Sequence, residues 1–145
     1  MSTGHPTLYV AEPPARYLPL PPLVVDCSTL AGIVFNEEWR AQAVERLEGR
    51  SLHAPNVLQA EIASVAVKKQ RRGEGHAATG LAEAGRLDVT LHRMDVQAVA
   101  ALALQYNLSA YDASYLWLAA ELQCPLATFD DKLAKAAQAH LSSLP

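Results

Sequence analysis

The sequence predicts an α/β domain built on a mainly parallel sheet, and three observations lead to this class. Short apolar runs alternate along the chain with longer segments of helical periodicity, as in sheets whose strands are joined by helices. Two runs, LVVD at 23–26 and PLATF at 125–129, are continuous rather than alternating, which is typical of strands buried on both faces. Half of the 145 residues are hydrophobic, which is enough for one domain with a sizeable core.

A proline-rich arm precedes this domain. Six of the nine prolines lie within residues 1–22, and proline fixes φ and removes a backbone donor, so the arm is expected to be extended. It also carries Tyr9, Tyr17 and Leu18, whereas a free linker usually has fewer apolar residues. We therefore expect an arm, 1–21, that packs on its own domain or across a dimer, followed by a folded domain, 22–145.

Helix and strand signals follow one another through the first half of the domain. After the first strand, Asn36 is placed to cap a helix that runs to about Leu47. The SLHAP run at 51–55 predicts a very short strand or an extended link. Pro55 is well placed to begin a helix that ends near Arg72.

The second half continues the alternation. A helix is expected near 75–84 and a strand at 87–92, and Asp95 then caps a helix over 96–106. That helix is apolar on nearly every face, so it is buried either in the core or in an oligomer interface. The remaining expected elements are a helix over 107–122, a strand at 125–129 and an amphipathic helix over 130–141.

Two aspartates directly follow the outer apolar runs. Asp26 ends the first expected strand and Asp130 ends the last, and sites in open parallel sheets form just beyond the carboxyl ends of strands. Each also has a structural explanation, Asp26 as a turn residue and Asp130 as the N-cap of the last helix. A capping box of Thr128 with Asp131 competes with the second explanation.

Two further acids lie on expected helices. Asp112 stands three residues after Ser109, which fits a capping box and complements the helix dipole. Glu61 is harder to explain in this way, because apolar residues stand at −4, −3, +1 and +4 from it and place it within the apolar stripe. A carboxylate that faces a core is costly unless something offsets its charge.

Taken together, the four acids Asp26, Glu61, Asp112 and Asp130 indicate a metal site. Carboxylates brought close together repel and raise one another's pKa, and a divalent cation removes that conflict. Hard oxygen ligands suit Mg²⁺ or Mn²⁺, whereas an all-carboxylate set argues against zinc. Such ions activate water and stabilise the leaving oxygen of a phosphodiester.

Three stretches, in this order, resemble the PIN-domain ribonucleases and, within them, the VapC-type toxins of bacterial toxin–antitoxin pairs. They are LVVDCSTL at 23–30, APNVLQAEIASV at 54–65 and YNLSAYDASYLWLAAELQCPLATFDDKLAKAA at 106–137. The third stretch is the most specific, and the resemblance covers about residues 22–140. It implies an α/β/α sandwich and a metal-dependent endoribonuclease whose acids are the four named above.

The resemblance also implies supporting residues and partners. Ser28 and Thr128 match positions that support the site through hydrogen bonds. An RNA substrate, a homodimer and a small antitoxin that inserts a segment near the acids are further expectations. This chain departs from the family in its arm, since such toxins usually begin close to the first strand. It also departs at Asp131, which follows Asp130 directly and is placed to share its role in the metal site.

A cluster of basic residues lies on a chain whose net charge is acidic. The charge of −3 gives no global basic field to attract nucleic acid. Four residues at the end of the Glu61 helix are nevertheless basic, and they form either a solvated helix end or a contact for RNA phosphates or an antitoxin. They are Lys68, Lys69, Arg71 and Arg72.

Other interpretations remain open. A non-catalytic binding module of the same fold and a DNA-directed nuclease both fit the acids, whereas a phospho-acceptor domain is disfavoured because Cys27 follows Asp26 where a second acid is needed. Cys27 and Cys124 are expected to be buried thiols of a cytoplasmic protein, since two cysteines make no disulfide framework. No apolar run reaches the length that crosses a bilayer.

Overall fold

A four-stranded parallel sheet forms the centre of the domain, as the sequence predicts. The computed structural model describes residues 6, 8, 9, 11 and 20–145. The strands are β1 (Pro22–Val25), β2 (Ser51–Pro55), β3 (Val89–His92) and β4 (Leu126–Ala127), and they lie in the order β3-β2-β1-β4. All three pairings are parallel, with Val24 opposite both His53 and Leu126.

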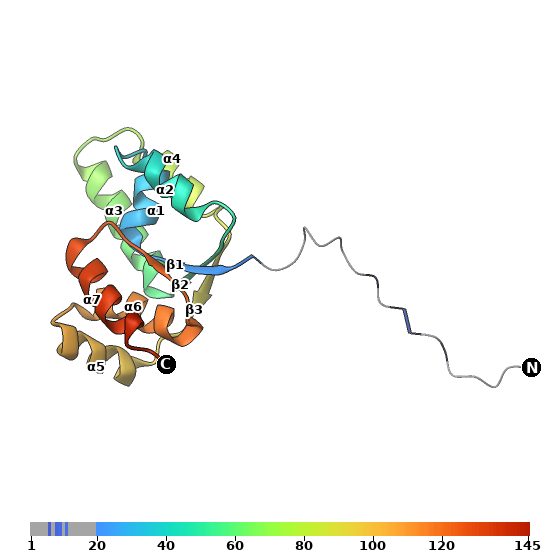
Figure 1. Ribbon diagram of the computed structural model, residues 1–145. Helices are drawn as coiled ribbons and strands as arrows, with labels where there is room; N and C mark the ends of the chain where they lie inside the picture. The colour runs from blue at the N-terminus through green and yellow to red at the C-terminus, as the bar shows by residue number, and fades with distance from the viewer. Residues whose placement is uncertain (1–5, 7, 10, 12–19) are drawn as a thin grey trace, which may run out of the picture.

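Helices cover both faces of this sheet (Figure 1). One layer holds α1 (Cys27–Val34), α2 (Arg40–Leu47), α3 (Val57–Arg71) and α4 (Ala77–Ala84), and the other holds α5 (Val96–Tyr106), α6 (Ala110–Leu122) and α7 (Asp131–Ser142). This is the expected α/β/α sandwich. The inner strand β1 is the most enclosed, since Leu23, Val24 and Val25 are all buried, which is why its run is continuously apolar.

The first helical region differs from the sequence prediction. Asp26 itself caps a helix, α1, that the sequence did not predict, and its carboxylate accepts a hydrogen bond from Thr29 N. Asn36 does not begin the following helix: it has a left-handed φ of 54° just after α1, a conformation that asparagine tolerates at the end of a helix. The second helix, α2, therefore begins only after Trp39, which gives no side-chain cap.

Two further boundaries are corrected. Pro55 ends β2 rather than beginning a helix, and α3 starts at Val57. The last strand is only Leu126–Ala127 and is half-buried, because the chain turns away at Thr128, whose hydroxyl accepts the Asp130 N–H at 2.9 Å. The predicted helix near 75–84, the strand near 87–92 and the Asp95 cap, which accepts from Ala98 N at 3.0 Å, are confirmed.

The helix α5 is not fully buried within this domain. Val99 and Leu102 face the core, but Val96 is 70% and Leu104 is 86% exposed. The described part of the arm is exposed too. Tyr9 is 85% exposed, so it does not pack on its own domain. Tyr17 and Leu18 lie outside the described residues.

Candidate functional site

Asp26 is the most completely hydrogen-bonded of the four acids. It directly follows β1 and is 4% exposed. Its Oδ1 accepts from Ser28 Oγ at 2.7 Å, from Thr29 N at 3.0 Å and from Thr29 Oγ1 at 3.0 Å, while its Oδ2 accepts from Thr128 Oγ1. Asp26 is thus a helix cap and a fixed, ionisable group at the carboxyl end of the sheet at once. A structural role in starting α1, which the sequence did not predict, is therefore compatible with a place in the site.

The loop after β4 is fastened to the same carboxylate. Because Val25 lies opposite Ala127 in the sheet, the residues that follow, Asp26 and Thr128, are neighbours. The hydroxyl of Ser28 donates to Asp26 and also accepts the Phe129 N–H at 3.0 Å. Ser28 and Thr128 therefore hold the loop and the acid together through hydrogen bonds.

Asp130 begins α7 at the end of this loop. Its Oδ1 accepts the Leu133 N–H at 2.8 Å, so it is the N-cap, and the competing box of Thr128 with Asp131 does not form. Asp131 instead forms an ion pair with Lys135 at 2.9 Å, and its side chain is 83% exposed. The geometry favours Asp130 over Asp131 as the acid that belongs to the site.

Glu61 lies on α3 and is half-buried. Its Oε1 accepts a hydrogen bond from Tyr115 Oη at 2.7 Å. Burial raises the pKa of Glu61, the bond from Tyr115 opposes that rise, and the charges of Asp112 and Asp26 raise the pKa further. The cost of burying this carboxylate is thus only partly offset by its phenol partner.

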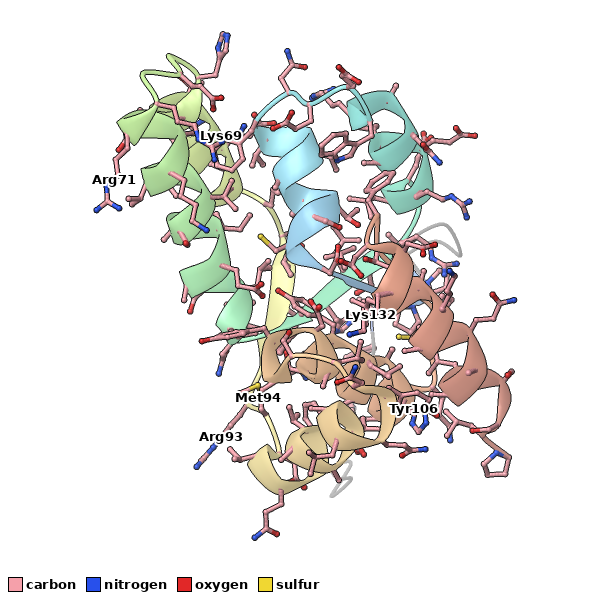
Figure 2. The ribbon with its side chains drawn as sticks, turned by 90° about the vertical axis from the view of Figure 1, so that its left-hand side faces the viewer. Lys69, Arg71, Arg93, Met94, Tyr106 and Lys132 are labelled. Carbon is pink, nitrogen blue, oxygen red and sulfur yellow. The ribbon has the colours of Figure 1, made fainter. Side chains whose placement is uncertain are left out.

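Asp112 lies in the first turn of α6. Its backbone N–H donates to Ser109 Oγ at 3.1 Å, as the capping box predicts. Burial raises the pKa of the Asp112 carboxyl, and the charges of Asp130 and Asp26 raise it further. The Lys132 side chain extends from the start of α7 toward α6 (Figure 2), and its charge lowers the same pKa.

These electrostatic effects connect all four acids. The charges of Asp26 and Asp130 act on Asp112, and the charges of Asp112 and Asp26 act on Glu61, so the four acids, from four separate segments, are linked pairwise by electrostatic effects. Within the described part of the chain, no three acidic, histidine or cysteine side chains lie close enough together to form a finished metal site. Mg²⁺ needs no such cage, because it commonly keeps several waters and binds through one or two carboxylates. The donor chemistry of these acids therefore fits a hard cation.

Cys27 lies beside the acids, and its surroundings disfavour the thiolate. Burial, together with the charges of Glu61 and Asp26, raises the pKa of its thiol to about 12, and only the thiolate reacts or binds metal. Cys124 is buried, and burial raises its thiol pKa as well. The prediction of buried thiols is confirmed for Cys124, whereas Cys27 is half-buried.

The four basic residues at the end of α3 differ in whether they are paired within the protein. The Lys69 ammonium is engaged within the protein, 2.6 Å from Glu37 and 3.3 Å from Glu74. Lys68, Arg71 and Arg72 are exposed, and Figure 2 shows the Arg71 side chain extending away from the body of the protein. Lys69 therefore fastens α3 to the loop before α2, and only the other three are free to meet a partner.

Sequence reasoning missed three residues of this site. Thr29 donates to Asp26 and also to the Ala127 carbonyl at 3.0 Å, a role that an Asp-x-x-Thr capping pattern would have indicated. Tyr115 is 1% exposed, and a buried phenol usually has a hydrogen-bond partner. No local signal marks Lys132, whose position depends on the approach of α7 to α6.

The fold and the acids together define an α/β domain with a carboxylate site at the end of a parallel sheet. A model of the PIN domain matches residues 23–139, and the chain belongs to the PIN-domain family. It is 35% identical over 120 residues to the VapC ribonuclease Mb0985 of Mycobacterium bovis and to ribonuclease VapC9 of Mycobacterium tuberculosis, with 81% of this chain and 92% of each relative covered.

Two proteins from Pyrobaculum aerophilum extend the comparison. Ribonuclease VapC3 is 33% identical over 121 residues, covering 78% of this chain and 92% of that protein. The crystal structure of PAE2754 matches with a TM-score of 0.63 at 19% identity, covering 88% of this chain and 93% of that one; it supports the fold. None of the described helices is long and apolar enough to span a membrane.

Proposed function

We propose that this chain is a metal-dependent endoribonuclease, the toxin of a type II toxin–antitoxin pair, acting in the cytoplasm. Its acids Asp26, Glu61, Asp112 and Asp130 hold Mg²⁺ or Mn²⁺ and hydrolyse RNA phosphodiesters. The observation that carries the proposal is that the charge of Asp26, at the end of β1, reaches both Glu61 and Asp112, and that the charge of Asp130, after the neighbouring strand β4, reaches Asp112. The VapC ribonucleases to which the chain is similar support it.

The side chains divide the work. A bound cation supplies activated water and stabilises the leaving oxygen. Asp26, held by Ser28, Thr29 and Thr128, presents a carboxylate of fixed orientation. Glu61, whose pKa is raised by burial, is suited to take the proton of the attacking water, because a base works best with a pKa near the operating pH. Attack by water leaves a 3′-hydroxyl end.

The test compares an RNA oligonucleotide with DNA of the same sequence. Cleavage of the RNA is expected with Mg²⁺ or Mn²⁺, with 3′-hydroxyl products, and none with EDTA. Asp26→Asn should abolish cleavage, whereas Asp88→Asn, which removes an exposed acid before β3, should leave it unchanged. Equal cleavage of the DNA would favour the DNA-directed nuclease, and an absence of both cleavage and Mn²⁺ binding would favour a non-catalytic module.

The proposal includes two protein partners. A homodimer is supported by the outer face of α5, which has no charged residue and exposes Val96 and Leu104. Leu104→Glu should then convert a dimer to a monomer in light scattering, whereas Leu81→Glu, at an exposed apolar residue on α4, should not. A small antitoxin is the second partner, and Lys68, Arg71 and Arg72 offer it, or the RNA backbone, positive charge.

A further inference from the structure

Two aromatic side chains lie at the surface beside the acids and contact each other. Trp39, which precedes α2, and Phe129, which follows β4, are each 37% exposed. Their ring centroids are 5.9 Å apart, with 48° between the ring planes. Neither ring belongs to the buried core of the described chain, so burial alone does not account for two large aromatic residues at this place.

Both rings are connected to the carboxylate site through one residue, Ser28. The Ser28 hydroxyl donates to Asp26 Oδ1 at 2.7 Å and accepts the Phe129 N–H at 3.0 Å. The Ser28 carbonyl accepts a hydrogen bond from Trp39 Nε1 at 3.4 Å. Phe129 also stands between Thr128, which donates to Asp26, and Asp130. The rings therefore border the acids and keep a defined place relative to them.

The backbone of α1 also holds the Trp39 indole in place. A Cβ at Gly32 would lie 2.2 Å from Trp39 Nε1 and 2.4 Å from Trp39 Cδ1, so the ring packs directly on the backbone of α1 where only glycine leaves room. The next residue, Arg40, donates from Nε to the Ile33 carbonyl at 3.2 Å. An aromatic ring that is already fixed loses little conformational entropy when it binds a ligand.

We propose that Trp39 and Phe129 form an aromatic platform that stacks an unpaired base of the RNA next to the phosphodiester at the acids. The inference rests on the proposed ribonuclease function. The net charge is −3 and the site itself is lined by carboxylates, so without the metal, attraction to phosphate contributes little to binding there. Stacking of bases on aromatic side chains supplies affinity that does not depend on charge, and it is the usual way in which proteins hold single-stranded RNA.

Binding without cleavage tests the platform directly. A single-stranded RNA oligonucleotide, added in EDTA, should quench the fluorescence of the parent protein, and an oligonucleotide of abasic ribose phosphates should not. The chain has two tryptophans, so the quench is assigned to Trp39 if it disappears in Trp39→Phe while binding, measured by fluorescence polarisation of a labelled RNA, persists. A quench that is equal for the abasic oligonucleotide would overturn the proposal, as would no quench by RNA.

Matched variants test the platform in cleavage. Phe129→Leu keeps an apolar side chain without a ring and should raise the KM for RNA about ten-fold, on the scale of one lost stacking contact, while kcat changes less. Phe129→Tyr keeps the ring and should behave like the parent protein. Gly32→Ala should displace the indole and weaken binding as Trp39→Leu does. Melting temperatures identify variants that fail to fold, and Leu81→Ala, an exposed apolar control, should change nothing.

The two readouts separate this inference from the function on which it rests. In one outcome, the protein cleaves none of the RNAs tested with any metal, yet RNA still quenches Trp39 and Phe129→Leu reduces that quench. The platform then stands and the ribonuclease proposal falls. If RNA is cleaved and the parent, Phe129→Leu and Trp39→Leu share one KM, the platform falls and the ribonuclease proposal stands. Loss of antitoxin inhibition in the same variants, with RNA binding unchanged, would identify the rings as a protein contact and overturn the inference.

Discussion

The two sides of the carboxylate site are built in different ways. On the β1 and β4 side, Asp26 accepts four hydrogen bonds from three residues: Ser28, Thr29 and Thr128. On the α3 and α6 side, Glu61 accepts one, from Tyr115, and burial and neighbouring charges raise the pKa of both Glu61 and Asp112. One acid is held by several donors, while the other two are left with charge that the protein does not fully compensate.

This difference separates a side of the site that mainly holds structure from a side that is suited to bind a cation or a proton. Donors aimed at a carboxylate fix its geometry and favour its charge. Carboxylates without enough donors favour any cation or proton that reaches them. We therefore expect substitutions on the Asp26 side to affect folding and activity together, and substitutions on the Glu61 and Asp112 side to separate them.

Among the substitutions that test this comparison, the largest effect is expected for Asp112→Asn. The change removes one negative charge from the group of acids, so metal-supported RNA cleavage should fall by about two orders of magnitude or more. The metal-free protein should be as stable as the parent or more stable, because repulsion is relieved. Unchanged cleavage, or products with cyclic phosphate ends, would contradict a metal-dependent role for this residue; Asp88→Asn is the charge-matched control.

Thr128→Val should affect both properties at once. It removes the donor to Asp26 Oδ2 and the acceptor of the Asp130 N–H, and leaving a buried acceptor short of a partner costs about 1–3 kcal/mol. We expect a lower free energy of unfolding in urea and about a ten-fold slower cleavage. Thr128→Ser keeps the hydroxyl and should retain most of the stability and of the cleavage rate. A Thr128→Val protein that is stable but inactive would contradict the coupling of folding and activity on this side.

Tyr115→Phe should change the pH dependence more than the rate at its optimum. The Tyr115 hydrogen bond lowers the pKa of Glu61, so its loss should raise that pKa and move the acidic limb of the pH–rate profile to higher pH. Tyr106→Phe, which removes a phenol bonded to His140 at 3.0 Å, is the matched control and should leave the profile unchanged. A profile that also stays unchanged in Tyr115→Phe would exclude Glu61 as the titrating base.

The smallest expected effect is a pH-dependent stabilisation by metal. A carboxyl with a raised pKa binds its proton more tightly in the folded than in the unfolded chain, so stability falls as pH rises from the unfolded pKa to the folded one. For Glu61 and Asp112 this window starts at their ordinary values of 4.5 and 3.8 and extends upward. Mn²⁺ should therefore raise the melting temperature more at pH 7 than at pH 5, and an equal increase at both would contradict the scheme.

The positions of the acids were predictable from the sequence because they follow from local rules. Continuous apolar runs marked β1 and the end of the chain's last strand, and residues that follow parallel strands meet at one edge of the sheet. Glu61 was recognisable because it interrupts an apolar stripe. The α1 helix was not predicted because a turn was the one structural role assigned to Asp26, although a cap that begins a helix directly after a strand uses the same residue.

By itself, the sequence determined the α/β class and the parallel sheet and indicated the four acids of the proposed site, since alternation and helical periodicity are properties of neighbouring residues. Only the tertiary structure decided which donors surround each acid, that Lys69 is taken by Glu37, and that Trp39 lies against Phe129. These contacts join segments far apart in the chain, and they depend on how helices pack across the sheet. No local pattern records that packing, because it is fixed by the combined shape and burial of many side chains.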